Sequence, residues 1–147
     1  MVPEVWVAAN RVSLGRGTQG QASGGSERPE PFRVLTRTRR GIARIRPIGD
    51  VDIGTVERIR EQIEQCTAAG AERVVLDLRG ATFLDSTGLD LVLEADANSR
   101  ADGWQFGLTG GPTRLQRVFD LTGCRARLPF LTAAQLAALL NAPDDAA

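Results

Sequence analysis

The spacing of hydrophobic residues changes repeatedly after residue 31, and each change predicts a new secondary-structure element. Apolar residues at alternate positions, or in short unbroken runs, predict strands, whereas apolar residues three and four positions apart predict helices. The predicted strands lie at residues 32–34, 42–48, 74–78, 104–108 and, with a weaker pattern, 127–131, and the predicted helices begin near residues 55, 85, 112 and 132.

The ends of these elements carry residues that typically start or stop helices. Thr55 precedes the first helix as an N-cap, and Gly70 ends that helix. Pro112 stands at the first turn of the third helix, where a missing N–H leaves no hydrogen bond unmade. Thr132 and Gln135 have the spacing of a capping box, which marks the start of the last helix.

The run at residues 74–78 is apolar at every position except Asp77, which is typical of a strand covered on both faces. Strands that alternate with helices imply right-handed crossovers. The sequence therefore predicts an α/β fold with a mixed, largely parallel sheet and helices packed around it. We expect one domain over residues 32–140, followed by a polar tail at residues 141–147.

Residues 1–31 form a leader of different character. Residues 13–31 are rich in Gly, Ser, Gln, Glu and Pro, so they are expected to be a flexible linker with too little apolar surface to offset the entropy of ordering. A Gly-x-Gly-x-x-Gly motif starts at Gly15, but no predicted strand precedes it and no helix follows, so we interpret it as coincidental. Residues 1–12 are compatible with an adhesive segment, an added strand or a start assigned too far upstream.

Composition limits the chemistry that the chain itself can perform. Its 147 residues include no histidine, lysine or tyrosine, which excludes histidine-based triads, lysine Schiff bases and the lysine-ended phosphate loop. Cys66 and Cys124 are too far apart in sequence for a redox pair or a metal knuckle. We expect no metal, no cofactor and no enzymatic activity. The sequence has no apolar run of membrane-spanning length and no basic signal segment, so we expect a cytoplasmic protein.

The formal net charge is zero, but it divides unevenly along the chain. Residues 1–46 hold nine arginines and three acidic residues, whereas residues 47–147 hold nine arginines and fifteen acidic residues. A basic arm can bind nucleic acid or a partner protein. Here the arginines are scattered and no aromatic residues are interleaved to stack on bases, so nucleic-acid binding is not expected.

The segment from residue 77 to residue 89 is the most unusual junction in the chain. A buried strand is expected to end there, a short loop carries Phe83-Leu84, and Asp85-Ser86-Thr87-Gly88 opens a helix. In α/β sheets, functional residues gather at the carboxyl ends of strands, where loops lead into helix N-termini. The junction is therefore the first place to look for a site.

A purely structural interpretation of this junction is also available. Asp85 or Ser86 would cap the helix by accepting hydrogen bonds from its first N–H groups. Phe83 and Leu84 would belong to the core, unless one of them faced a partner, and Gly88 would permit a close backbone approach. The local sequence does not decide between the two interpretations.

Three segments of the chain share a pattern with a known family. They are the run from Val75-Leu76-Asp77-Leu78 to Phe83–Leu89, the turn Gly49-Asp50-Val51-Asp52, and Phe119–Gly123, whose Thr-Gly ends the third helix. Together they resemble STAS domains, especially bacterial anti-sigma factor antagonists, which carry Asp-Ser-(Ser/Thr)-Gly-Leu at such a junction and a Gly-x-(Leu/Val/Ile)-Asp turn upstream. The resemblance covers residues 32–140 and implies a STAS-like fold.

The resemblance also implies a function, in which Ser86 is the phosphoacceptor of a partner-switching system. The unphosphorylated protein would bind an anti-sigma factor that is itself a serine kinase; phosphorylation would end the binding, and a separate phosphatase would restore it. Asp52 would help Ser86 to meet the kinase, although it also fits as a plain turn residue. The partner-binding residues implied are Asp50, Asp52, Asp85, Ser86, Thr87 and Gly88.

Other functions stay open at this point. A STAS domain can serve as a scaffold in a signalling or lipid-transport complex without any switch, or as a sensor that binds a nucleotide or lipid in the cleft at the sheet end. A hydrolase using Ser86 is disfavoured, because the Gly-x-Ser-x-Gly elbow is absent and the chain has no histidine or lysine to activate the hydroxyl.

Overall fold

The computed structural model describes residues 7–8 and residues 31–141. The remainder of the predicted leader and the tail after residue 141 lie outside the described residues. Two elements at the amino-terminal side of the domain form a hairpin. They are β2 (Arg33–Arg39) and β3 (Ile42–Val51), which pair antiparallel along the whole of β2.

The hairpin turn and its outer edge follow from local sequence. Arg40 and Gly41 have φ angles of 53° and 81°, the left-handed conformation that a tight two-residue hairpin turn requires. On the other side of β2, β1 (Val7–Ala8) pairs antiparallel with Leu35 and Thr36. Of the three interpretations of residues 1–12, the added strand is therefore the one seen at residues 7–8.

The remaining strands run parallel to β3. β4 (Arg73–Leu76) pairs with the first half of β3, and β5 (Ala81–Leu84) pairs with its carboxyl end. β6 (Gln105–Leu108) pairs with the far side of β4, so the strand order is β1-β2-β3-β4-β6 with β5 beside the end of β3. The predicted mixed, largely parallel sheet is confirmed.

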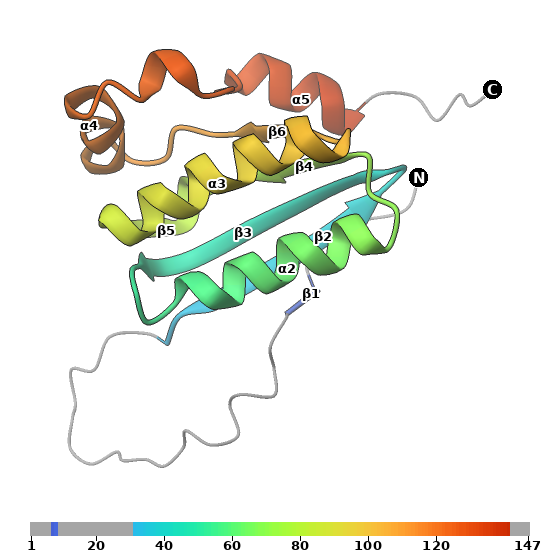
Figure 1. The fold of residues 1–147 in the computed structure, drawn as a ribbon, viewed down its shortest axis with the longest axis horizontal. Helices are drawn as coiled ribbons and strands as arrows, with labels where there is room; N and C mark the ends of the chain where they lie inside the picture. Colours follow the sequence, from blue (N-terminus) through green and yellow to red (C-terminus); the bar gives the residue numbers. More distant parts are fainter. Residues whose placement is uncertain (1–6, 9–30, 142–147) are drawn as a thin grey trace, which may run out of the picture.

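The described chain contains four α-helices and two 3₁₀ turns. α2 and α3 contact each other and lie across the same face of the sheet, whereas α4 and α5 lie along the edge beyond β6 (Figure 1). None of these helices is long and apolar enough to cross a membrane. Their bounds are α2 Val56–Ala68, η2 Leu78–Gly80, α3 Ser86–Asp102, α4 Thr113–Leu121, η3 Arg125–Arg127 and α5 Ala133–Asn141.

One hydrophobic cluster joins the helices to the sheet. Val74, Val75 and Leu76 of β4 are all fully buried, which confirms the prediction of a strand covered on both faces. Ile59 of α2 and Leu91 of α3 are also fully buried against this sheet. Side chains of this size each contribute about 1.5–3 kcal/mol on burial, so the core holds the strand ends in fixed positions.

Three predicted boundaries were wrong. Residues 81–84 form β5 rather than a loop, because the carboxyl half of β3 extends past β4 and offers them an edge to pair with. Residues 127–131 are not a strand: a single bridge joins Phe130 to Leu108. β4 ends at Leu76 because Asp77 caps the η2 turn, its side chain accepting a hydrogen bond from the Arg79 N–H.

Candidate functional site

Two strand ends meet the start of α3 at one edge of the sheet. In the β3–β5 pair Asp50 lies opposite Phe83, and Val51 lies opposite Leu84. The next residue, Asp85, donates its backbone N–H to the Val51 carbonyl at 3.2 Å. The upstream turn and the Asp85–Leu89 junction, far apart in sequence, are therefore neighbours in the structure.

Gly88 allows α3 to approach β3 closely. A Cβ atom at this position would lie 2.9 Å from Val51 Cγ1, 3.0 Å from Leu84 Cγ and 3.1 Å from the Val51 carbonyl oxygen. The first distance is shorter than real Cβ contacts and the other two are tighter than ordinary contacts, so a side chain here would displace its neighbours, whereas glycine does not. The close approach predicted for Gly88 is present, and it allows the first turn of α3 to pack directly against Val51 and Leu84.

Asp85, and not Ser86, caps α3. The Asp85 Oδ1 atom accepts a hydrogen bond from the Gly88 N–H at 3.0 Å, with an extended backbone at Asp85. Ser86 is exposed at the first helical position, and its hydroxyl has no hydrogen-bond partner among the residues that the structure describes. Thr87, the second hydroxyl, is half-buried. The capping role is therefore filled by a neighbour, and the Ser86 hydroxyl is left accessible.

The turn after β3 is tied together by its own polar groups. Asp52 Oδ1 accepts from the Gly54 N–H at 2.9 Å, so Asp52 acts here as a turn residue. Thr55 occupies the N-cap position of α2 as predicted, but its hydroxyl donates to the Asp50 carbonyl at 2.8 Å and makes no capping hydrogen bond. Across the strands, the Thr82 hydroxyl donates to Asp50 Oδ1 at 2.6 Å. The carboxylates of Asp50 and Asp52 are thus held in place at the sheet edge.

Two large apolar side chains are exposed in the same elements. Ile53, in the turn after β3, is 79% exposed, and Phe83 of β5 is 46% exposed. Leu84 belongs to the core, and Phe83 is the one of the two that is exposed and available to a partner. We call the set formed by Asp50, Asp52, Ile53, Phe83, Asp85 and Ser86 the Ser86 surface.

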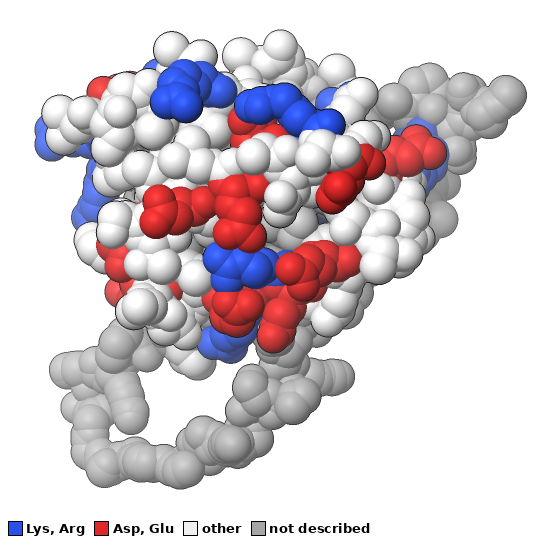
Figure 2. Space-filling view, in the orientation of Figure 1, with Lys and Arg blue, Asp and Glu red and all other residues white. Residues whose placement is uncertain are grey.

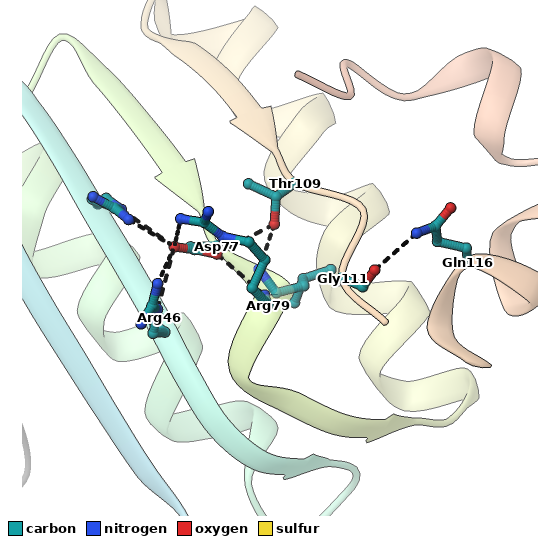
Figure 3. A network of polar contacts seen from close by, with 8 residues as sticks. Arg46, Asp77, Arg79, Thr109, Gly111 and Gln116 are labelled. Atoms are coloured by element: carbon teal, nitrogen blue, oxygen red, sulfur yellow. Dashed lines mark hydrogen bonds and ion pairs between the residues drawn. The ribbon is translucent and has the colours of Figure 1, made fainter. Parts of the chain in front are cut away.

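A second polar cluster lies at the carboxyl end of β4, beside the middle of β3. Asp77 is fully buried, and its carboxylate accepts hydrogen bonds from the guanidinium groups of Arg44, Arg46 and Arg79 at 2.9–3.3 Å (Figure 3). Burial by itself would raise the pKa of Asp77, but the hydrogen bonds from Arg79 and the nearby charge of Arg46 hold that pKa well below its ordinary value.

The sequence marked none of these arginines as partners of Asp77. Arg44 and Arg46 are alternate residues of β3, and Arg79 follows Asp77 by two positions. Burial lowers the pKa of Arg44, and the Asp77 charge partly offsets that effect. We call Asp77 with Arg44, Arg46 and Arg79 the Asp77 cluster.

Acidic side chains gather on the face formed by α2 and α3 (Figure 2). Arg60 of α2 joins the two helices: its Nε and Nη2 atoms donate to the Glu94 carboxylate at 3.0 and 3.1 Å, and its Nη1 atom contacts Glu57. Among the described residues no three histidine, cysteine, aspartate or glutamate side chains are grouped so that they could hold a metal ion.

Comparison with known proteins agrees with the fold. A family model described as STAS domain matches residues 33–137. An anti-sigma factor antagonist from Mycobacterium paratuberculosis is similar in structure, with a TM-score of 0.64 and 23% identity over 78% of this chain and 98% of that one. The unphosphorylated anti-sigma factor antagonist SpoIIAA gives a TM-score of 0.59 and 24% identity over 75% and 96%.

The similarity is not confined to antagonists. A sulfate transporter family protein from Wolinella succinogenes gives a TM-score of 0.54 and 19% identity over 68% of this chain and 86% of that one. No curated protein matches the chain significantly. At these identities the solved structures establish the fold alone.

Proposed function

The chain belongs to the STAS domain family, and from this premise we propose that it is an anti-sigma factor antagonist regulated by phosphorylation of Ser86. The observation that carries the proposal is the exposed Ser86 hydroxyl, which stands at the start of α3 while Asp85 makes the cap. Asp85 occupies the cap position, so the Ser86 hydroxyl is not required to satisfy the first N–H groups of the helix. A kinase can reach this hydroxyl without any unfolding of the chain.

The Ser86 surface has the composition of a docking site for a protein. Ile53 and Phe83 expose apolar area that a partner could bury, and the carboxylates of Asp50, Asp52 and Asp85 belong to the same turn and strand ends. Protein interfaces combine an apolar centre with a polar rim in this way. We infer that the unphosphorylated surface binds an anti-sigma factor and thereby releases the sigma factor.

Phosphorylation would oppose this binding through charge. A phosphate on Ser86 adds about −1.5 to −2 charge next to the carboxylate of Asp85. The helix dipole tolerates the anion, so the fold is kept, but an interface built around a neutral serine would have to desolvate the anion. A loss of about 3 kcal/mol weakens binding more than a hundredfold. The switch then needs no large conformational change.

In this proposal the chain is the substrate of its partner and not an enzyme. The anti-sigma factor supplies ATP and the kinase activity, a separate phosphatase removes the phosphate, and all three act in the cytoplasm. Thr87 is the weaker acceptor candidate, because its side chain is half-buried in the first turn of α3.

Capture on two variants tests the proposal. Ser86→Ala should retain the partner in the presence of ATP, and Ser86→Asp should lose it. Mass spectrometry should identify the retained protein as an anti-sigma factor with a kinase fold. If Ser86→Ala and Ser86→Asp retained the same proteins equally, the switch would be excluded and a scaffold role would be favoured.

A further inference from the structure

A hollow of about 460 Å³ lies between two segments of the chain. One segment is η2 with the start of β5, and the other is the start of α4. Its walls are formed by Arg79–Thr82 and Pro112–Arg114, so it lies beside the Ser86 surface without including any residue of that surface. We call it the Arg79–Arg114 hollow. Its volume is within the range of sites that hold small molecules.

Two guanidinium groups line the hollow. Arg79 donates its Nε and Nη2 hydrogens to Asp77 at 2.9 Å each, and its side chain is still 47% exposed. Arg114 donates from Nη1 to the Thr82 carbonyl at 3.3 Å. Within the described residues neither side chain has a further partner, so both arginines that line the hollow keep unused N–H donors.

The charge of the hollow is positive, because no acidic residue lines it. Asp77 binds Arg79, but that carboxylate is completely buried and its single charge is shared with Arg44 and Arg46. It therefore neutralises Arg79 only in part. Thr113, the first residue of α4, adds a hydroxyl and a backbone N–H that Pro112 does not cap.

Hydrogen bonds already fix the segments that form the walls of the hollow before any ligand binds. The Thr109 hydroxyl accepts from the Leu78 N–H at 2.9 Å and lies 3.4 Å from Asp77 Oδ1, which ties η2 to the loop before α4 (Figure 3). The Gln116 amide donates to the Gly111 carbonyl at 2.8 Å and fixes the other end of that loop. Groups held in place before binding lose less entropy when a ligand arrives.

We propose that the Arg79–Arg114 hollow binds a phosphate group, either as inorganic phosphate or as the phosphate of a small monoester. Phosphate oxygens match the paired N–H groups of guanidinium side chains, and two arginines can approach one phosphate from different sides. The hydroxyl and N–H of Thr113 supply further donors of the kind that bind such anions. The proposal is independent of partner switching, since it involves neither Ser86 nor a second protein.

Titration of the isotopically labelled full chain with sodium phosphate tests the proposal, with ionic strength held constant by sodium chloride. The amide signals of Thr82, Thr113 and Arg114 should shift and saturate. Arg114→Gln should weaken binding about tenfold or more, because a charge-assisted contact is lost. Arg117→Gln, on the same helix but outside the hollow, should bind as the unchanged chain does. The dispersion of each spectrum shows that the variant is folded.

A parallel titration with glycerol 3-phosphate separates the two sources of the phosphate group. Tighter binding of the ester would identify a monoester as the ligand, and equal binding would identify the phosphate group alone. Shifts that are non-saturable, that spread over arginines elsewhere, or that survive Arg114→Gln would overturn the proposal. None of these results depends on whether Ser86 is phosphorylated, so a failure here leaves the proposed function unaffected.

Discussion

Asp77 and Asp85 each follow a strand that runs parallel to β3, yet their environments are opposite. Asp77 is fully buried and its carboxylate is shared by three guanidinium groups. Asp85 is half-buried and makes one capping hydrogen bond, which leaves the next residue, Ser86, accessible. An aspartate at the same kind of junction therefore has two roles. Asp77 holds β3 and β4 together, whereas Asp85 caps α3 and leaves the Ser86 hydroxyl exposed.

The two ends of the η2–β5 segment therefore have different roles. At the Asp77 end, the buried carboxylate binds three guanidinium groups, and its substitution should affect folding. At the Ser86 end, a polar hydroxyl and two large apolar side chains are exposed, and substitutions should affect binding. Stability and affinity measurements on matched variants can separate these two outcomes.

The largest expected effect comes from Asp77→Asn. The amide keeps the size of the side chain but removes the charge, so the buried guanidinium of Arg44 and its neighbours lose their common anion. Breaking such a buried pair costs about 3–5 kcal/mol. Urea denaturation should show this loss, whereas Asp120→Asn, which breaks the surface pair with Arg125, should cost less than about 1 kcal/mol. Equal losses would contradict the role of Asp77.

The Asp77 cluster should also make stability depend on pH. The folded-state pKa of Asp77 lies well below the ordinary aspartate value of about 4. Its contribution to the free energy of unfolding is therefore complete above about pH 4 and is lost as the pH falls toward the folded-state pKa. The difference in unfolding free energy between the unchanged chain and Asp77→Asn should become smaller as the pH is lowered from about 5 to about 3. A difference that stayed constant would refute this account.

Gly88→Ala should have an intermediate effect. The new Cβ would meet Val51 and Leu84 at 2.9–3.1 Å and push the start of α3 away from β3, at a cost of about 1–3 kcal/mol. Gly54→Ala is the matched control, because its Cβ would lie 3.4 Å from Asp52 Oδ1 in an exposed turn. Thermal unfolding of both variants checks the prediction, which fails if Gly88→Ala is as stable as Gly54→Ala.

Ile53→Ser should change affinity and leave stability almost unaltered. Ile53 is 79% exposed, so its replacement should alter the free energy of unfolding by no more than about 0.5 kcal/mol. At an interface the same change should weaken binding to the anti-sigma factor about fivefold or more. Leu121→Ser replaces a side chain that is 84% exposed at the end of α4, outside the Ser86 surface, and should bind normally. Equal affinity of the two variants would remove Ile53 from the interface.

Much of this fold could be predicted from the spacing of apolar residues. The hairpin at Arg40-Gly41, the buried β4 and the capping box at Thr132 and Gln135 depend on neighbours in sequence, and all three are present in the structure. β5 was missed because its pairing depends on the free carboxyl half of β3, which is distant in sequence.

The candidate site was predictable only in part. Ser86 and its neighbours stand out by sequence, whereas the identity of the cap does not, since Asp85 and Ser86 are both good caps. The exposure of Phe83 contradicts the expectation for a large aromatic residue and follows from its place on the edge strand β5. Asp77 lies inside an apolar run, and its arginine partners on β3 are more than thirty positions away in the sequence, so the spacing of residues did not predict the Asp77 cluster.

The most direct test of the central claim is the affinity of the purified anti-sigma factor for this protein before and after phosphorylation. The protein would be incubated with its kinase partner and ATP, and intact mass spectrometry with peptide mapping would locate the modification. We predict one phosphate, on Ser86, and binding at least about a hundredfold weaker by calorimetry, as about 3 kcal/mol requires. A phosphate at another residue, or a phosphorylated Ser86 that binds as tightly as before, would contradict the account.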